Sequence, residues 1–199
     1  MIDPVPRKLN LSNLSYVFQR IMDLEAFIFF GTLLGYTREN NIIENDDDID
    51  IYVNKKEYNS LLAALRATSF ELQLLPKKKW YRWKYPFGTP LVLQATRMLE
   101  NTPTFVDFYF YDDTETHEIL ERWNFKGQWK NPDSYLRTPK KLVYPIRSGK
   151  LNDIEVKIPH NPRELCLFLY GDTWQTPLKK REEYEAKIIA NKPVIIYEN

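Results

Sequence analysis

The sequence predicts an α+β domain in which helices flank a mixed or antiparallel sheet. Amphipathic helical spacing occurs near both ends of the chain, strand-like runs follow one another in the middle, and turn residues separate those runs. At 199 residues the chain is expected to form a single domain over 1–199. Hydrophobic residues make up 43% of it, which is enough for a buried core and excludes a disordered polyampholyte.

The individual elements follow from hydrophobic periodicity and turn chemistry. In chain order they are a helix over 11–22, strands over 27–30 and 48–53, a helix over 55–68, strands over 70–75, 80–85, 91–98 and 105–111, a hairpin of 142–146 with 154–158, a helix over 162–171 and a charged helix over about 177–190. Asn10 or Ser12 would cap the first helix, and Pro162 suits the first turn of the helix that it begins.

Charge and composition exclude several classes of protein. The 28 Lys and Arg residues against 27 Asp and Glu residues give a net charge of +1, which lacks the basic excess of nucleic-acid binders. Cys166 is the single cysteine, so neither an internal disulfide nor a Cys/His zinc site is expected. The N-terminal stretch shows no secretory signal, and no apolar run is long enough to span a bilayer. We therefore expect a cytoplasmic protein without an integral membrane segment.

An acidic cluster occupies residues 44–50, directly before an apolar strand. On a strand, Asp48 and Asp50 share one face, where two carboxylates repel each other unless a cation lies between them. Hard oxygen ligands in this arrangement favour Mg²⁺ or Mn²⁺. A solvated acidic loop is the alternative. An EF-hand counted from Asp46 is disfavoured, because Ile51 would occupy the sixth position, where calcium loops need glycine.

Asp107 lies within the aromatic strand run over 104–111. A lone carboxylate there is costly to bury without a partner, and a metal ion shared with Asp48 and Asp50 would provide one if the two strands are neighbours. The alternative is an aspartate at a strand edge that faces water. We predict Asp48, Asp50 and Asp107 as catalytic residues and metal ligands, with Asp46 orienting them and Asp47 on the opposite strand face.

A strand that ends at Gly31 and Thr32 precedes the acidic cluster. Amide groups at the start of the helix that follows would bind a phosphate, and Arg38 would neutralise it through its guanidinium fork. For Arg38 a salt bridge to Glu44 or a nearby aspartate is the alternative.

Two further pairs are candidates for binding the nucleotide. Arg82 and Lys84 share a face of a basic, aromatic strand, which would present cations to a phosphate. That strand would otherwise be a charge-protected sheet edge or, less in keeping with the net charge, a platform for single-stranded nucleic acid. Asp172 and Trp174 follow the helix over 162–171, where they would line the pocket, or Trp174 would belong to the core.

The segment GTLLGYTRENNIIENDDDID, residues 31–50, resembles the signature of the LicD family, which includes bacterial phosphocholine transferases and fukutin-related proteins. The matching positions are Gly31, Leu33, Leu34, Gly35, Arg38, Ile43, Asp46, Asp47, Asp48, Asp50 and Ile51. Phe105-Val-Asp107-Phe resembles the family's later strand aspartate, and Tyr170-Gly-Asp-Thr-Trp174 resembles its Tyr-Gly-x-x-Trp element. The chain departs from the family where Glu44-Asn45 replaces Pro-Trp.

The resemblance implies a nucleotidyltransferase fold and a metal-dependent phosphotransferase. Such an enzyme moves a phospho-alditol or phosphocholine group from a CDP-linked donor to a hydroxyl of a glycan or glycolipid acceptor. Mg²⁺ or Mn²⁺ is the implied cofactor, and no nucleic-acid partner is expected. A lipid-linked acceptor would bring the protein to a membrane surface. The alternatives are transfer of a nucleoside monophosphate from an NTP to a small hydroxyl compound, and a non-catalytic module that binds metal or nucleotide.

Overall fold

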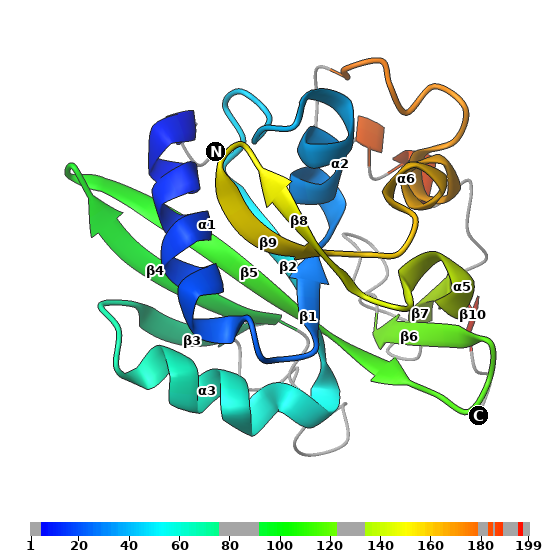
Figure 1. Ribbon diagram of the computed structural model, residues 1–199, viewed down its shortest axis with the longest axis horizontal. Helices are drawn as coiled ribbons and strands as arrows, with labels where there is room; N and C mark the ends of the chain where they lie inside the picture. The colour runs from blue at the N-terminus through cyan, green and yellow to red at the C-terminus, as the bar shows by residue number, and fades with distance from the viewer. Residues whose placement is uncertain are drawn as a thin grey trace.

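An eight-stranded mixed sheet is the centre of the computed structural model, which describes residues 5–75, 92–122, 134–178, 183–184, 186–188 and 195–196 (Figure 1). Its strands are β1 (Ala26–Ile28), β2 (Asp48–Asn54), β3 (Glu71–Leu75), β4 (Val92–Leu99), β5 (Thr102–Asp113), β6 (Glu118–Arg122), β7 (Ser134–Pro139) and β10 (Ile195–Ile196). The strand order is β1-β2-β5-β6-β7-β10, and β4 also pairs with β5 and carries β3 on its other side. The expected α+β class is confirmed.

Strands β2 and β5 form the parallel pair on which the candidate site is built. Their register places Asp48 beside Phe105 and Asp50 beside Asp107. The other strand pairs of this sheet, among the described residues, are antiparallel. The crossover from β2 to β5 contains the 3-10 helix η1 (Lys55–Glu57), helix α3 (Tyr58–Arg66) and the antiparallel pair β3–β4. Parallel strands need such a long connection, since a tight turn can only reverse the chain.

Helices α1 (Arg7–Ile21) and α3 cover one face of the sheet. Tyr58 of α3 packs edge-on against Phe110 of β5, with ring centroids 5.3 Å apart. On β4, Arg97 donates from Nε to Asn13 Oδ1 of α1 at 2.6 Å. Apolar residues of β2, β4 and β5 alternate along each strand and are fully buried beneath these helices, as with Ile51 and Phe108. The opposite face of the sheet also contributes to the core, through Phe27, Tyr52 and Tyr111.

The opposite face carries the polar members of the same strands. Strand alternation places Asp50 on β2 and Asp107 on β5 there, with Tyr52 and Tyr109 two residues farther along each strand. Phe30, at the start of helix α2 (Phe30–Glu39), packs edge-on against Tyr109 at 5.1 Å. Helix α2 therefore lies beside the acidic residues.

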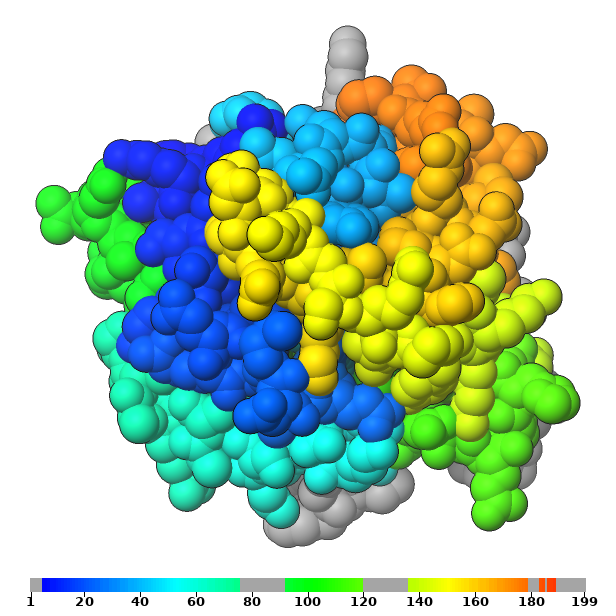
Figure 2. Space-filling model, viewed as in Figure 1, coloured from blue at the N-terminus to red at the C-terminus, as the bar shows by residue number. Residues whose placement is uncertain are grey.

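The remaining elements extend the domain around α2 and the end of the sheet. They are α5 (Lys140–Val143), the hairpin of β8 (Arg147–Leu151) with β9 (Ile154–Ile158), and α6 (Pro162–Tyr170). Figure 2 shows that the hairpin fills the surface between α1, α2 and α6. No helix within the described ranges has the length and apolar character that crossing a membrane requires.

The structure differs from the sequence-based prediction at several elements. The strand expected over 27–30 is β1, Ala26–Ile28, and Phe30 already belongs to helix α2. Helix α1 begins at Arg7 after Pro6, so Asn10 and Ser12 both lie inside it and neither is its cap. The first hairpin strand is Arg147–Leu151 and not 142–146, because Asn152 adopts the left-handed φ of 52° that the turn needs. Strands β6 and β7 were not predicted. The predicted strand over 80–85 lies outside the described residues. Of the predicted helix over 177–190, the described residues 177–178 are not helical, whereas 183–184 and 186–188 are.

Candidate active site

Asp50 and Asp107 face each other across neighbouring strands. They are direct partners in the parallel register of β2 and β5, and each residue is only 7% exposed to solvent. Paired residues on adjacent strands lie about 4.8 Å apart and point to the same face. The sequence predicted that Asp107 would lie close to the acidic cluster, and the structure places Asp107 directly beside Asp50.

The backbone turn from β1 into α2 fixes the position of Asp50. The Gly31 N–H donates to Asp50 Oδ2 at 2.8 Å, while the Asp50 N–H donates to Thr32 Oγ1 at 2.9 Å. The Phe29 N–H donates to the Asp50 carbonyl at 3.0 Å. Gly31 and Thr32, predicted as phosphate-binding residues, thus hold a carboxylate in this structure, and a phosphate contact from them stays a prediction.

Phe30 takes a strained conformation at this turn. Its φ of 37° lies in the left-handed region, which costs a non-glycine residue on the order of 1–3 kcal/mol. The ring is held by Phe29 at 4.8 Å, Tyr52 at 5.5 Å and Tyr109 at 5.1 Å. Aromatic packing therefore stabilises the sharp bend that directs the Gly31 amide at Asp50.

Asp48 stands among four other carboxylates. Burial, followed by repulsion from Asp50, Asp46, Asp107 and Asp47, raises the pKa of Asp48 well above its ordinary value. The five acids therefore form one electrostatic unit. A divalent cation would relieve this repulsion, because opposite charge favours the ionised form of each carboxylate.

The structure gathers Asp46, Asp47 and Asp48 more tightly than the sequence predicts. One carboxylate oxygen from each lies within 4.8 Å of the others, and this trio is the group with metal-ligand spacing among the described residues. Asp47 was expected on the opposite strand face. It precedes β2, which begins at Asp48, so strand alternation does not apply to it. Which acids bind a metal stays a prediction, with Asp47 now among the candidates.

A tight turn and a buried asparagine hold the loop that carries these acids. The Asp46 N–H donates to the Ile43 carbonyl at 3.2 Å, and Asn45 has a φ of 63°. Asn10, fully buried in α1, donates from Nδ2 to the Asp46 carbonyl at 2.9 Å. Asparagine tolerates left-handed backbone well, so Asn45 suits the position where the family has Trp.

The predicted basic and aromatic residues have different surroundings. Arg38 donates to Tyr184 Oη at 3.3 Å and has no ion pair within the described ranges. Glu44, its expected salt-bridge partner, pairs instead with Arg7 at 3.2 Å. Trp174 is 7% exposed and belongs to the core, which was the alternative to its predicted place in the pocket. Asp172 is exposed. Arg82 and Lys84 lie outside the described residues.

Sequence reasoning missed two residues at the site, Asn10 and Gln94. Gln94 of β4 is the register partner of Asp107 and donates from Nε2 to Asp107 Oδ1 at 3.0 Å. A glutamine in a strand of alternating polar and apolar residues usually faces solvent, so nothing in the sequence marks Gln94 as a site residue. Asn10 does give a signal, because it lies on the apolar face of its helix, four residues before Leu14.

The donor set fits a hard divalent metal ion. It consists of carboxylate oxygens, which Mg²⁺ and Mn²⁺ prefer. Asp50 and Asp107 lie on neighbouring strands in fixed register but are not part of the trio with metal-ligand spacing, so the predicted set of Asp48, Asp50 and Asp107 is not the group with that spacing among the described residues. The set contains neither a cysteine nor a histidine, so a zinc site is not favoured.

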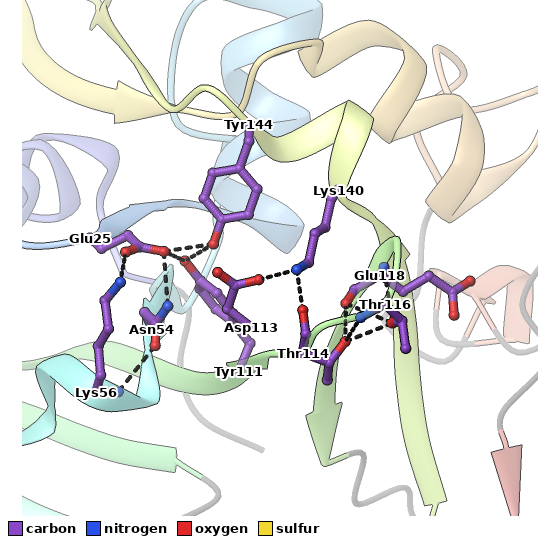
Figure 3. Close-up of polar contacts among 10 residues, drawn as sticks. All are labelled: Glu25, Asn54, Lys56, Tyr111, Asp113, Thr114, Thr116, Glu118, Lys140 and Tyr144. Carbon is purple, nitrogen blue, oxygen red and sulfur yellow. Dashed lines mark hydrogen bonds and ion pairs between the residues drawn. The ribbon is translucent and has the colours of Figure 1, made fainter.

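A second polar cluster lies at the other end of β2 and β5 (Figure 3). Glu25 Oε1 accepts from Asn54 Nδ2 at 2.8 Å, from Tyr144 Oη at 2.6 Å and from Tyr111 Oη at 3.1 Å, and Lys56 forms an ion pair with Oε2. An open cavity of about 490 Å³ adjoins it. Because donors already surround this carboxylate, the cluster has a structural role.

Comparison with known proteins shows which proteins the chain as a whole is similar to. Among solved structures, a lincosamide antibiotic adenylyltransferase, LnuA with lincomycin bound, is similar with a TM-score of 0.52 and 12% identity, over 93% of this chain and 95% of that one. An antigenic nucleotidyltransferase-like protein from Paracoccidioides brasiliensis has a TM-score of 0.48 and 14% identity, over 94% of this chain and 77% of the other. No curated protein matches the sequence.

The similarity to the adenylyltransferase shows a nucleotidyltransferase-like fold and no more, given the low identity. A family model is more specific. The model described as LicD/FKTN/FKRP, nucleotidyltransferase domain, matches residues 23–161, a range that contains Gly31, Asp48, Asp50 and Asp107. Family and fold together support a transferase of the LicD kind. The chain therefore belongs to the LicD/FKTN/FKRP nucleotidyltransferase-domain family.

Proposed function

We propose that this protein is a metal-dependent phosphotransferase, which moves a phospho-alditol or phosphocholine-type group from a CDP-linked donor to a hydroxyl of a glycan or glycolipid. The observation that carries the proposal is the pairing of Asp50 with Asp107 beside Asp48, within a chain of the LicD family. Five clustered carboxylates are unfavourable without a cation and suitable for binding one.

In this proposal, the site residues have separate roles in metal binding and proton transfer. Asp48, Asp50 and Asp107 would hold Mg²⁺ or Mn²⁺, which when bound offsets the charge of the donor diphosphate and of the developing transition state. Asp107 would accept the proton of the attacking hydroxyl as the new phosphate ester bond forms and the bond to CMP breaks. Gly31 holds Asp50 in place, and Arg38, on the same helix as Gly31, would neutralise a phosphate.

Transfer of a nucleoside monophosphate from an NTP is the second candidate. One solved structure of similar fold is described as an adenylyltransferase, and the similarity covers 95% of that chain. The same carboxylates would serve either reaction, because both attack phosphorus in a metal-bound polyphosphate.

A thermal-shift screen separates the candidates at the level of binding. The ligands are CDP-choline, CDP-ribitol, CDP-glycerol and the four NTPs, each with and without Mg²⁺. A ligand that binds the native state at 100 times its dissociation constant adds about 2.7 kcal/mol of stability. We expect a CDP-linked compound to raise the melting temperature in the presence of Mg²⁺.

Product analysis then identifies the reaction. Release of CMP from the CDP-linked donor supports the proposal, and release of pyrophosphate from an NTP supports the second candidate. A protein that binds none of these compounds, with or without Mg²⁺, would contradict both and favour a non-catalytic module.

A further inference from the structure

A row of polar side chains crosses the sheet at the level of the candidate site. Asp50 on β2 pairs with Asp107 on β5, Asp107 pairs with Gln94 on β4, and Gln94 pairs with Gln73 on β3. Register partners on adjacent strands point to the same face. On this face of the sheet, the carboxylates of Asp50 and Asp107 are therefore followed by the side-chain amides of Gln94 and Gln73, in the direction away from β1.

Gln94 makes the direct contact to Asp107. Its Nε2 donates to Oδ1 at 3.0 Å, an ordinary hydrogen-bond length, and both residues lie inside long paired strands. Gln94 is half-buried and Asp107 is buried, so this hydrogen bond is partly shielded from water. The neighbouring positions Leu93 and Ala95 are buried in the core on the other face, which fixes the backbone that carries Gln94.

This bond constrains how Asp107 can act. Oδ1 accepts from the amide, so the bond holds the carboxylate in one rotation. Both oxygens of the carboxylate are then held in a fixed direction relative to the strand, which defines how a cation or a hydroxyl proton would approach it. Groups that hydrogen-bond to ligating carboxylates orient them, and their removal typically weakens metal binding about 10- to 100-fold.

We propose that Gln94 is a positioning residue, which orients the Asp107 carboxylate for metal binding and for the attacking hydroxyl. The inference rests on the metal site of the proposed function. Gln94 touches neither the metal nor the reacting atoms; it acts through Asp107.

Mn²⁺ binding measured by calorimetry on the full chain, without any donor, tests the inference. Gln94→Met keeps the length of the side chain and removes the donor. Gln73→Met is the matched control, since it makes the same change on the same face about 10 Å from Asp107, two strand spacings away. We expect the dissociation constant for Mn²⁺ to rise about tenfold in Gln94→Met and to keep its wild-type value in Gln73→Met. Gln94→His restores an N–H donor and is expected to recover most of the affinity.

The outcomes separate the inference from the proposed function. Wild-type protein that binds Mn²⁺, together with a Gln94→Met variant of equal affinity, overturns the role of Gln94 and leaves the metal site standing. Wild-type protein that binds no Mn²⁺ overturns both. Equal losses in Gln94→Met and Gln73→Met would mean general disturbance of the sheet and also reject the role. Circular dichroism of each variant establishes that it folds. If Gln94→Met does not fold, Gln94→Leu, which also lacks the N–H donor, supplies the decision by the same criterion.

Discussion

At the scale of one residue, Asp48 lowers the stability of the metal-free fold because it lies among other carboxylates. Its pKa is raised by burial and by four carboxylates around it, so the native state without metal binds a proton there more tightly than the unfolded chain does. Stability therefore falls as the pH rises from the ordinary carboxyl value of 3.8 toward the raised one. The same repulsion between carboxylates that lowers the stability of the metal-free protein favours the binding of a cation among them.

Replacement of Asp48 by Asn is expected to stabilise the metal-free protein near neutral pH, by on the order of 1 kcal/mol, because it removes one half-buried charge from a repelling group. The same change is expected to abolish metal-dependent stabilisation. Urea unfolding with and without Mg²⁺, repeated from pH 4 to 8, measures both effects. Asp153→Asn, an exposed turn aspartate, is the control that should leave both curves unchanged. A loss of stability in metal-free Asp48→Asn would contradict the electrostatic account.

Asp50 and Asp107 are expected to be indispensable for transfer. Asp50→Asn and Asp107→Asn each keep the shape of the side chain and remove its charge, so turnover should fall at least about 100-fold, about 2.7 kcal/mol in the barrier, while the fold survives. CMP release under saturating Mg²⁺ is the measurement, with thermal unfolding alongside. Near-normal turnover in either variant would reject the assigned role.

Gly31 is needed because two carboxylates approach it. A Cβ at this position would lie 3.0 Å from Asp46 Oδ2 and 3.1 Å from Asp50 Oδ2, closer than most real contacts of that atom. Gly31→Ala should push both side chains by a few tenths of an ångström. Because catalytic geometry is sensitive at that scale, we expect activity to fall about tenfold with little change in stability. Turnover and the urea midpoint, measured together, distinguish this from unfolding.

At the scale of an element, helix α2 connects the strand turn to the acidic loop. Its first turn directs the Gly31 amide at Asp50, and its end at Asn40, with a left-handed φ of 51°, returns the chain toward Asp46. The returning loop crosses the helix at Gly35, where a Cβ would lie 2.4 Å from the Asn41 carbonyl oxygen. The second glycine of the family signature therefore serves packing.

Gly35→Ala is expected to act on stability more than on chemistry. The clash is with backbone, which cannot rotate away as a side chain can, so we expect a loss of roughly 1–3 kcal/mol or more. The midpoint of urea unfolding measures this. The contrast with Gly31→Ala is itself a test: if Gly35→Ala kept full stability and lost activity, the packing role given to Gly35 would be wrong.

At the scale of the whole molecule, the Glu25 cluster ties together segments that are distant in sequence. Glu25 before β1, Asn54 at the end of β2, Tyr111 on β5 and Tyr144 after α5 meet at one carboxylate (Figure 3). Hydrogen bonds from Lys56, Tyr144 and Asn54 outweigh the effect of burial and lower the pKa of Glu25. The cluster fixes the end of β2 and β5 that lies away from the candidate site.

This direction sets the pH dependence of the cluster. A carboxyl whose pKa is lower in the native state stabilises the fold above its unfolded value, here 4.5, and that stabilisation is lost as the pH falls through the native value. Glu25→Gln should destabilise the protein at pH 7 by about 1–3 kcal/mol, and the difference from wild type should shrink below pH 4. Chemical unfolding at pH 7 and pH 3.5 measures it. A difference that grew with acidity would contradict the assignment.

The sequence by itself determined the local features of this protein. Period and turn residues located helix α3, strands β3, β4 and β5, and helix α6 with Pro162 at its start, because these depend on neighbours a few residues apart. The run of acids before a buried strand indicated a metal site for the same reason, since alternation alone places Asp48 beside Asp50.

Only the tertiary structure decided what meets across the chain. The pairing of Asp50 with Asp107, the hydrogen bond of Gln94 to Asp107 and the reach of Asn10 to Asp46 depend on strand register and helix placement. Strand register is set by the burial of one whole sheet face and not by any single residue. The role of Gly31 changed for this reason: its amide points at a carboxylate because the antiparallel register of β1 with β2 brings Asp50 to the start of α2.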